Sequence, residues 1–366
     1  MPARRAFVAA SVVSAAASPL ALAVMSLAAT PAAEISVTAT IKPIHALVAQ
    51  VMEGVGEPSL LVKGAASPHT YALKPSDAKA LNHANVVFRV SETVEPFTRK
   101  IAASLPDSVR VVTLADAPGI EWLPVRTGDT FEAHDHAHDH GHDGHDHKDG
   151  HGHAGHDHAH DHDDQGAASH DHDHDHGHDH GDHAADASRN GDAPRDGHVW
   201  LDPENARKML AEIARVLSEA DPAHADTFKA NAARADAAIK ALEDEIARDL
   251  APIKDKPYVV FHDAYQYFEH RFGLSAVGSI TINPEAKPSA KRLTEIRKKL
   301  ATLSASCVFG EPQFQTRLVA TVTEGTSARA GTLDPEGALV EPGPAAYETL
   351  LRNLASGLKS CLVRAS

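Results

Sequence analysis

The sequence is poor in cysteine and has no surplus of basic residues, and both shortages limit what the protein can be. Its 366 residues include 35 Lys and Arg against 50 Asp and Glu, which gives a formal net charge of −15. Because no basic face is left over, the composition does not favour a protein that binds nucleic acid. Only Cys307 and Cys361 carry thiols. In an oxidising compartment such a pair indicates one disulfide, with two reduced, buried thiols as the alternative.

The first 33 residues have the pattern of a secretory signal. Arg4 and Arg5 precede an apolar, Ala-rich stretch over residues 7–29, and small residues continue to Ala33. This pattern predicts a signal peptide over residues 1–33. A retained anchor helix is the alternative, because the stretch is long enough to span a bilayer. No cysteine follows the apolar stretch that could carry a lipid anchor, so we expect a free periplasmic protein.

Residues 134–183 contain 20 His, 14 Asp and one Lys, and nothing more apolar than Ala. A segment without aliphatic or aromatic side chains gains no favourable burial free energy to offset the entropy lost on ordering. Residues 133–197 are therefore predicted to be a disordered insert. Imidazole is a common metal ligand, and a His-rich tract is typical of metal binding. A charged spacer is the alternative. Residues 134–183 carry a formal charge of −13, which leaves −2 for the rest of the chain.

On both sides of the insert, short β-branched runs that predict strands alternate with amphipathic segments that predict helices. One of these helices is predicted over residues 94–105. This α/β pattern predicts parallel sheets covered on both faces, arranged as two similar doubly wound lobes that face each other across a cleft. Strands are expected over residues 36–41, 59–62, 86–90 and 109–114 in the first lobe, and 258–261, 276–280, 307–310 and 328–333 in the second.

Between the lobes, apolar residues recur every three or four positions from Phe228 to Leu250. This spacing places them on one face of a single helix of about 40 Å that begins near Pro222. We expect a rigid connector between the lobes, with a coiled-coil dimer as the alternative. The expected domains are a signal peptide (1–33), an N-terminal lobe in two parts (34–132 and 198–221) separated by the insert (133–197), a linking helix (222–252) and a C-terminal lobe (253–366).

The candidate metal ligands follow from the rule that parallel sheets bind ligands beyond the carboxyl ends of their strands. Of the seven histidines outside the insert, His69, His198 and His262 are placed there, and Asp334 ends the last predicted strand. Three imidazoles with a carboxylate or water form a typical zinc set. Satisfied core histidines and a turn-forming or capping aspartate are the alternatives. Among the other histidines, His45 is expected at a helix start, and His83, His224 and His270 at the surface.

Five motifs then show a resemblance to a known family: ASPHTYALKPSD (66–77), GHVWLDP (197–203), FHDAY (261–265), FGEPQF (309–314) and LDP (333–335). With them the chain resembles the metal-specific solute-binding proteins of ABC transporters, and among these the zinc-specific periplasmic ones. The resemblance implies two α/β lobes joined by a long rigid helix, with the metal between them. Zinc-specific members often carry a His-rich loop at the place of this insert, and the cysteines resemble a disulfide found in them.

The resemblance also implies a ligand set. His69, His198 and His262 correspond to the zinc ligands of the family, and His262 stands where manganese-binding members have Glu. Asp334 matches a carboxylate that ligates the metal in some members and lies farther away in zinc-specific ones. Some zinc-specific members place a Glu immediately before the first ligand, where this chain has Pro68. Water or Asp334 would then complete the zinc shell.

The function implied is capture of zinc in the periplasm and its delivery to an ABC permease and its ATPase in the inner membrane, with zinc as the cargo of a monomeric binding protein that is not an enzyme. Alternatives are a zinc-dependent hydrolase, a periplasmic zinc buffer and a metal-dependent adhesin on the same fold. A hydrolase needs a positioned general base. Besides Asp334, the nearest strand-end carboxylate is Glu311, which we expect to hydrogen-bond the second nitrogen of a ligand.

Overall fold

The computed structural model describes residues 35–102, 104–126, 194–281, 284, 287–302, 305–314 and 317–363. The expected signal peptide over residues 1–33 and residues 133–193 of the expected insert lie outside the described part. Within it, no helix is long and apolar enough to cross a membrane.

Two four-stranded sheets, all of whose strands are parallel, form the framework. The first has the order β2-β1-β3-β4 and the second the order β6-β5-β7-β8. In both sheets the chain starts at an inner strand, moves to one edge and then continues on the other side, which is the doubly wound pattern predicted from the sequence. The strands are β1 (Val37–Ala39), β2 (Ser59–Leu60), β3 (Val86–Arg89), β4 (Arg110–Thr113), β5 (Tyr258–His262), β6 (Ala276–Thr281), β7 (Cys307–Gly310) and β8 (Arg329–Thr332).

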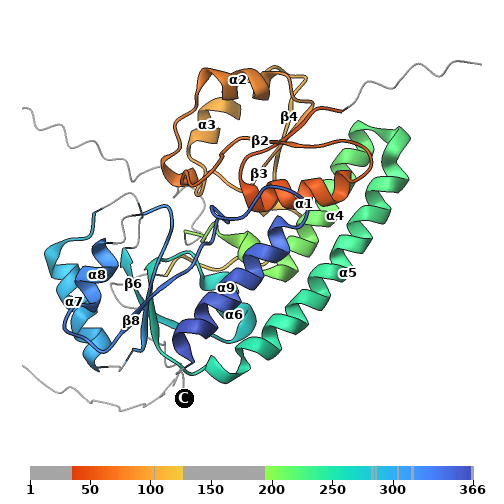
Figure 1. Ribbon diagram of the computed structural model, residues 1–366. Helices are drawn as coiled ribbons and strands as arrows, with labels where there is room; N and C mark the ends of the chain where they lie inside the picture. Colours follow the sequence, from red (N-terminus) through yellow and green to blue (C-terminus); the bar gives the residue numbers. More distant parts are fainter. Residues whose placement is uncertain are drawn as a thin grey trace, which may run out of the picture. The chain divides into compact units, whose positions relative to one another are not determined.

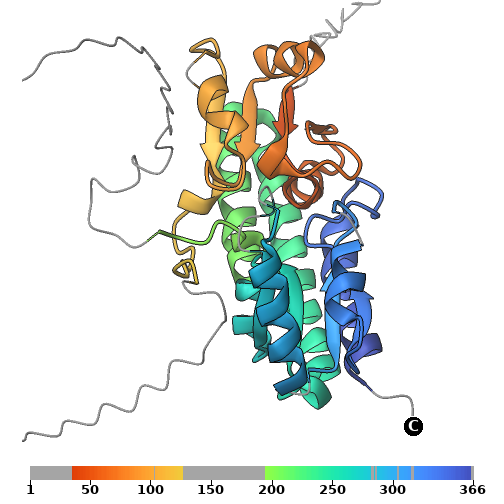
Figure 2. The same ribbon diagram turned by 90° about the vertical axis from the view of Figure 1, so that its left-hand side faces the viewer.

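Helices surround the two sheets and form two lobes (Figures 1 and 2). The α-helices are α1 (Lys42–Met52), α2 (Pro75–Asn82), α3 (Phe97–Ala102), α4 (Pro203–Ala220), α5 (Ala225–Leu250), α6 (Gln266–Phe272), α7 (Ala290–Thr302), α8 (Arg317–Thr323) and α9 (Ala346–Leu362). Short 3-10 helices include η1 (Pro68–Thr70), η3 (Val199–Leu201) and η4 (Pro222–His224). One continuous apolar cluster runs from β1 and α1 through α4 and α5 to α9, so the lobes share part of their core.

The long helix α5 connects the lobes as predicted. It has 26 residues, which corresponds to about 39 Å. Its buried apolar side chains are those whose spacing predicted the helix, from Phe228 to Leu250. Helix α5 packs against α1, α4, α6 and α9, and Figure 1 shows it extending along both lobes. The predicted first turn is instead the separate 3-10 helix η4.

The prediction of a helix over residues 94–105 was too long, because α3 begins only at Phe97. Glu95 is fully buried, and its Oε2 accepts hydrogen bonds from the backbone N–H groups of Val90 (2.6 Å) and Ser91 (3.2 Å). Pro96 disfavours a helical conformation for Glu95. A turn closed by the Glu95 side chain therefore occupies the place of the expected first helical turn.

The lobes are also joined by direct contacts between the start and the end of the chain. Helix α1 packs against α9. The Lys42 ammonium at the start of α1 donates to three carbonyls of the loop after β8, those of Gly337 (2.5 Å), Ala338 (3.1 Å) and Val340 (2.6 Å). Within the second lobe, Cys307 of β7 and Cys361 of α9 form the expected disulfide.

Candidate metal centre

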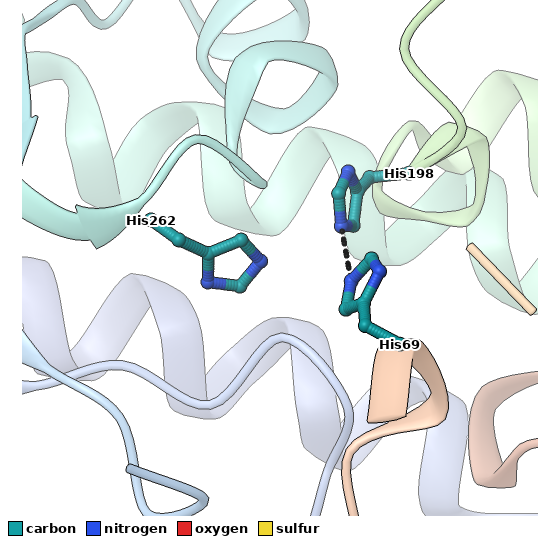
Figure 3. A group of neighbouring side chains, drawn as sticks. All are labelled: His69, His198 and His262. Atoms are coloured by element: carbon teal, nitrogen blue, oxygen red, sulfur yellow. Dashed lines mark hydrogen bonds between the residues drawn. The ribbon is translucent and has the colours of Figure 1, made fainter. Parts of the chain in front are cut away.

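The structure brings His69, His198 and His262 together (Figure 3). One nitrogen of each ring lies within 4.8 Å of the corresponding nitrogens of the other two. The Nε2 atoms of His69 and His198 are 3.3 Å apart, and the three ring centroids are separated by 5.3, 5.3 and 5.8 Å. His198 and His262 are buried, whereas His69 is half-buried. These distances are small enough for one metal ion to contact all three imidazoles.

Each histidine is placed by its local sequence. His262 is the last residue of β5, whose five residues are all buried, so its ring projects from the carboxyl end of an inner strand. His69 lies in η1, whose first position is occupied by Pro68, a residue suited to that position by its fixed φ. His198 directly precedes η3. The backbone before it packs so closely that a Cβ on Gly197 would lie 2.5 Å from Thr93 Oγ1.

Carboxylates orient two of the three rings. The Oδ1 atom of Asp196 accepts from the backbone N–H of His198 at 3.0 Å and lies 2.7 Å from its Nδ1. Glu311 Oε1 lies 2.7 Å from Nδ1 of His262, as expected for Glu311. Because an ionised carboxylate only accepts hydrogen bonds, Nδ1 is the donor in both rings, and each ring in its neutral form keeps the lone pair on Nε2. Such carboxylate–histidine pairs fix the ring and raise its basicity as a ligand.

The electrostatics of the group fit a bound cation. Nε2 of His262 is buried and has no hydrogen-bond partner among the described residues, which is costly for a polar atom unless a ligand occupies the site. Burial, together with the neighbouring His198 and His262, lowers the pKa of His69 to about 2. Burial also acts to lower the pKa of His262, but the Glu311 carboxylate outweighs it and raises this pKa above its ordinary value. At neutral pH the His69 ring therefore offers a lone pair.

Asp334 is not part of this group. Its Oδ1 accepts from Nε2 of Gln313 at 3.1 Å, and its Oδ2 accepts from the backbone N–H of Leu339 at 3.1 Å. The carboxylate thus holds the loop that follows β8. Pro68 offers no side-chain ligand at the position before His69. Among the described residues, the group found by geometry therefore contains nitrogen ligands and no carboxylate.

The other histidines lie apart from this group. His83 and His270 are exposed as predicted, and His224 is half-buried. His45 lies in the first turn of α1, with Nε2 at 3.0 Å from the carbonyl oxygen of Pro58.

Two further residues near the site were missed from the sequence. Asp196 could have been found, because a carboxylate two residues before a ligand histidine can reach its Nδ1. Arg126 could not have been found. Its partners Asp263 and Glu269 are 137 and 143 residues away in the chain, and no local pattern marks such pairs.

Comparison with known proteins agrees with this fold. The family model described as "ZnuA: Zinc-uptake complex component A periplasmic" matches residues 37–361. The high-affinity zinc uptake system protein ZnuA of Brucella abortus (strain 2308) is 47% identical over 331 residues, which are 89% of this chain and 91% of that protein. The protein of the same name from Yersinia pestis is 34% identical over 90% of this chain and 92% of its own length. A crystal structure of ZnuA superimposes with a TM-score of 0.66 at 21% identity, covering 90% of this chain and 99% of that one. Because the family model and these relatives extend over most of its length, this chain belongs to the ZnuA family.

Proposed function

We propose that this protein captures zinc between its two lobes in the periplasm and delivers it to an ABC permease and its ATPase in the inner membrane. The observation that carries the proposal is the convergence of three imidazoles from separate segments, two of them oriented by carboxylates. One of their nitrogens, Nε2 of His262, is buried and has no hydrogen-bond partner among the described residues. Family membership supports zinc as the cargo. The domain boundaries given above, a monomeric state and periplasmic localisation are parts of the same proposal.

We propose His69, His198 and His262 as the zinc ligands, with water in the fourth position. Zinc accepts three imidazoles and one oxygen in a tetrahedron, whereas manganese, magnesium and calcium prefer sites with more oxygen ligands. Asp334 does not belong to the group found by geometry, and its oxygens already accept from Gln313 and Leu339, so water is the simpler fourth ligand. Copper prefers such a nitrogen site even more strongly than zinc, so the metal bound in the cell also depends on availability.

Binding and release fit the site better than hydrolysis does. A zinc hydrolase needs a carboxylate or another base within hydrogen-bond reach of the metal-bound water. Asp196 and Glu311, the carboxylates in contact with the imidazoles, each hold an Nδ1 atom through one oxygen and so contact the ring at the nitrogen other than Nε2. Their geometry supports a ligand-orienting role.

The proposed function is tested by growth under zinc limitation. A strain that lacks the gene should stop growing in chelator-treated medium, and added zinc should restore growth whereas added manganese should not. The wild-type gene supplied in trans should restore growth, and the variant with His69, His198 and His262 all replaced by Ala should not. Growth of the deletion strain at the wild-type rate in zinc-depleted medium would argue against a role in zinc uptake, as would full complementation by the triple variant.

Removing residues 133–186 should leave one tight zinc per chain and abolish a set of weaker sites. The residues on both sides of the insert hold each other, since the backbone N–H of Val125 donates to the carbonyl of Pro194 at 2.8 Å. Fusion beyond this contact should leave the described fold undisturbed. Calorimetric zinc titration of both forms measures the change, with melting temperature as the control for folding. If the deletion removed the tight site and kept the weak ones, tight binding would belong to the histidines of the insert and weak binding to those between the lobes, which is the reverse of our assignment.

Acidification should separate the two kinds of site in the full-length chain. We expect the histidines of the insert to titrate near the ordinary imidazole pKa of about 6.5, raised somewhat by neighbouring Asp, so that at about pH 5.5 most of them should be protonated and release metal. In the interlobe site, protons compete weakly for His69, whose pKa is about 2, and more strongly for His262, whose pKa is raised. Because the fold holds all three rings in place, the site should nevertheless keep its metal to a lower pH than the insert does. Zinc content is measured after equilibration at pH 7.5 and at pH 5.5. It should be higher at pH 7.5 and should fall to about one ion per chain at pH 5.5. Complete loss of zinc at pH 5.5 would contradict this expectation.

A further inference from the structure

We propose that Arg126 is a positioning residue for the zinc site. It docks the segments on either side of the insert onto the C-terminal lobe, and this holds His198 and His262 as a preformed pair. The inference rests on the zinc-binding function proposed above. It adds a residue outside the ligand set and explains how ligands far apart in the sequence keep a fixed separation.

The two segments form an antiparallel pair, here called the stem, made of residues 123–126 and 194–196. Pro124 pairs with Arg195 in an antiparallel bridge. The backbone N–H of Asp196 donates to the carbonyl of Leu123 at 2.9 Å, next to the Val125–Pro194 bond. The second strand of the stem then leads directly to His198. Its last residue, Asp196, is the one whose carboxylate holds Nδ1 of that ligand.

The stem is attached to α6 of the C-terminal lobe. The hydroxyl of Tyr267, a buried residue of α6, accepts from the backbone N–H of Leu123 at 3.0 Å and donates to the carbonyl of Asp196 at 2.7 Å. It therefore contacts both strands of the stem at once. The Nε2 atom of Gln266 adds a third bond, to the carbonyl of Pro124 at 3.1 Å.

Arg126 provides the charged part of this attachment. Its Nε donates to both carboxylate oxygens of Asp263 (2.9 and 3.1 Å), its Nη2 also donates to Asp263, and its Nη1 donates to Glu269 at 2.7 Å. Asp263 immediately follows the ligand His262 in the chain. One guanidinium thus links the first strand of the stem to the residue next to one ligand, while the second strand carries the other ligand.

The ion pairs of Arg126 are largely buried, so their loss should be costly. The side chains of Asp263 and Glu269 are 7% and 4% exposed, and that of Arg126 is 19% exposed. Without the guanidinium, two buried carboxylates lose their charged partner, which is strongly unfavourable. The stem also loses its charged contact with Asp263 and Glu269, so it can shift with respect to α6. His198 and His262 then lose their fixed separation.

The test compares Arg126→Gln and Arg126→Lys in the full-length protein, with Arg215→Gln as the matched control. Arg215 is an exposed residue of α4 that pairs with Glu212 and Glu219. Zinc affinity is measured against a chelator strong enough to strip the weak sites, and cobalt absorption reports ligand geometry. We expect Arg126→Gln to weaken zinc binding about 10- to 100-fold, the range for residues that orient metal ligands, and to change the cobalt spectrum. Arg126→Lys should restore part of the affinity, because the charge remains and the planar fork is lost.

The zinc affinity of the control Arg215→Gln should stay within about twofold of wild type, because exposed ion pairs contribute little. A folded Arg126→Gln protein with wild-type zinc affinity and cobalt spectrum overturns the inference, even if its melting temperature falls. If that variant does not fold, Tyr267→Phe removes only the hydroxyl that joins the strands of the stem. Tyr267→Phe should also bind zinc more weakly than wild type, and unchanged zinc affinity in this variant refutes the positioning role. Absence of tight zinc binding in the wild-type protein would instead refute the proposed function itself.

Discussion

Replacing His262 by Ala is expected to weaken tight zinc binding by about 100- to 1000-fold. Apparent binding free energies of structural zinc in zinc-finger peptides are about 10–16 kcal/mol. Shared over four ligands, a value of this order is about 2.5–4 kcal/mol for each, and every 1.4 kcal/mol corresponds to a factor of ten. His262 should lie at the upper end, because its loss also leaves the buried Glu311 carboxylate without its imidazole partner. Chelator competition measures the affinity, and thermal unfolding without metal should show lower stability.

His69→Ala should lose zinc affinity to a similar extent with little change in stability, because its ring is half-buried and belongs to a short 3-10 helix. The exposed His270 provides the matched control, and His270→Ala should bind zinc like the wild type. Asp334→Ala should cost less affinity than any ligand replacement. Tight zinc binding that persists in the triple variant of His69, His198 and His262 would exclude the interlobe site.

Reduction of the Cys307–Cys361 disulfide is expected to lower the free energy of unfolding by about 4 kcal/mol without changing zinc stoichiometry. The cysteines are separated by 54 positions, and loop-closure entropy for a ring of that size gives about 4 kcal/mol. The melting temperature should fall by about 10 °C. Neither sulfur belongs to the metal group, since the disulfide ties β7 to α9. The zinc ligands should therefore remain in place.

Thermal unfolding with and without reductant, followed by zinc analysis of both samples, measures these effects. The Cys307→Ala/Cys361→Ala variant should melt like the reduced protein and should no longer respond to reductant. Two free thiols in the native protein, or loss of the tight zinc on reduction at a temperature where the protein stays folded, would contradict this prediction.

The features that could be predicted from the sequence depend on short-range patterns. The apolar spacing from Phe228 to Leu250 predicted α5 and its buried face, because helix geometry maps spacing directly onto a face. The strand-end rule selected His69, His198 and His262, because parallel strands collect their carboxyl ends at one edge. Glu311 was recognised as a partner of a ligand nitrogen from its place at the end of β7.

The remaining features depend on contacts that no local pattern encodes. Asp334 has the position of a ligand in the sequence, yet its oxygens accept from Gln313 and Leu339, and only the folded loop shows this. The stem and Arg126 depend on pairing across the insert. The late start of α3 depends on the buried Glu95 side chain reaching back to Val90 and Ser91. In each case the side chain bonds to partners that come close to it only in the tertiary structure.

The contact between the two ends of the folded chain has a consequence for the order of events during synthesis. Lys42 near the start is held by carbonyls of residues 337–340, α1 packs on α9, and the disulfide uses Cys361. A polypeptide that emerges from its N-terminus cannot form these contacts until its last segment is available, although earlier parts can begin to fold. Contacts over such long sequence separations also form slowly. The nascent chain therefore contains His69 and His198 long before the fold that fixes their distance to His262 is complete, so tight binding at the interlobe site requires the finished molecule.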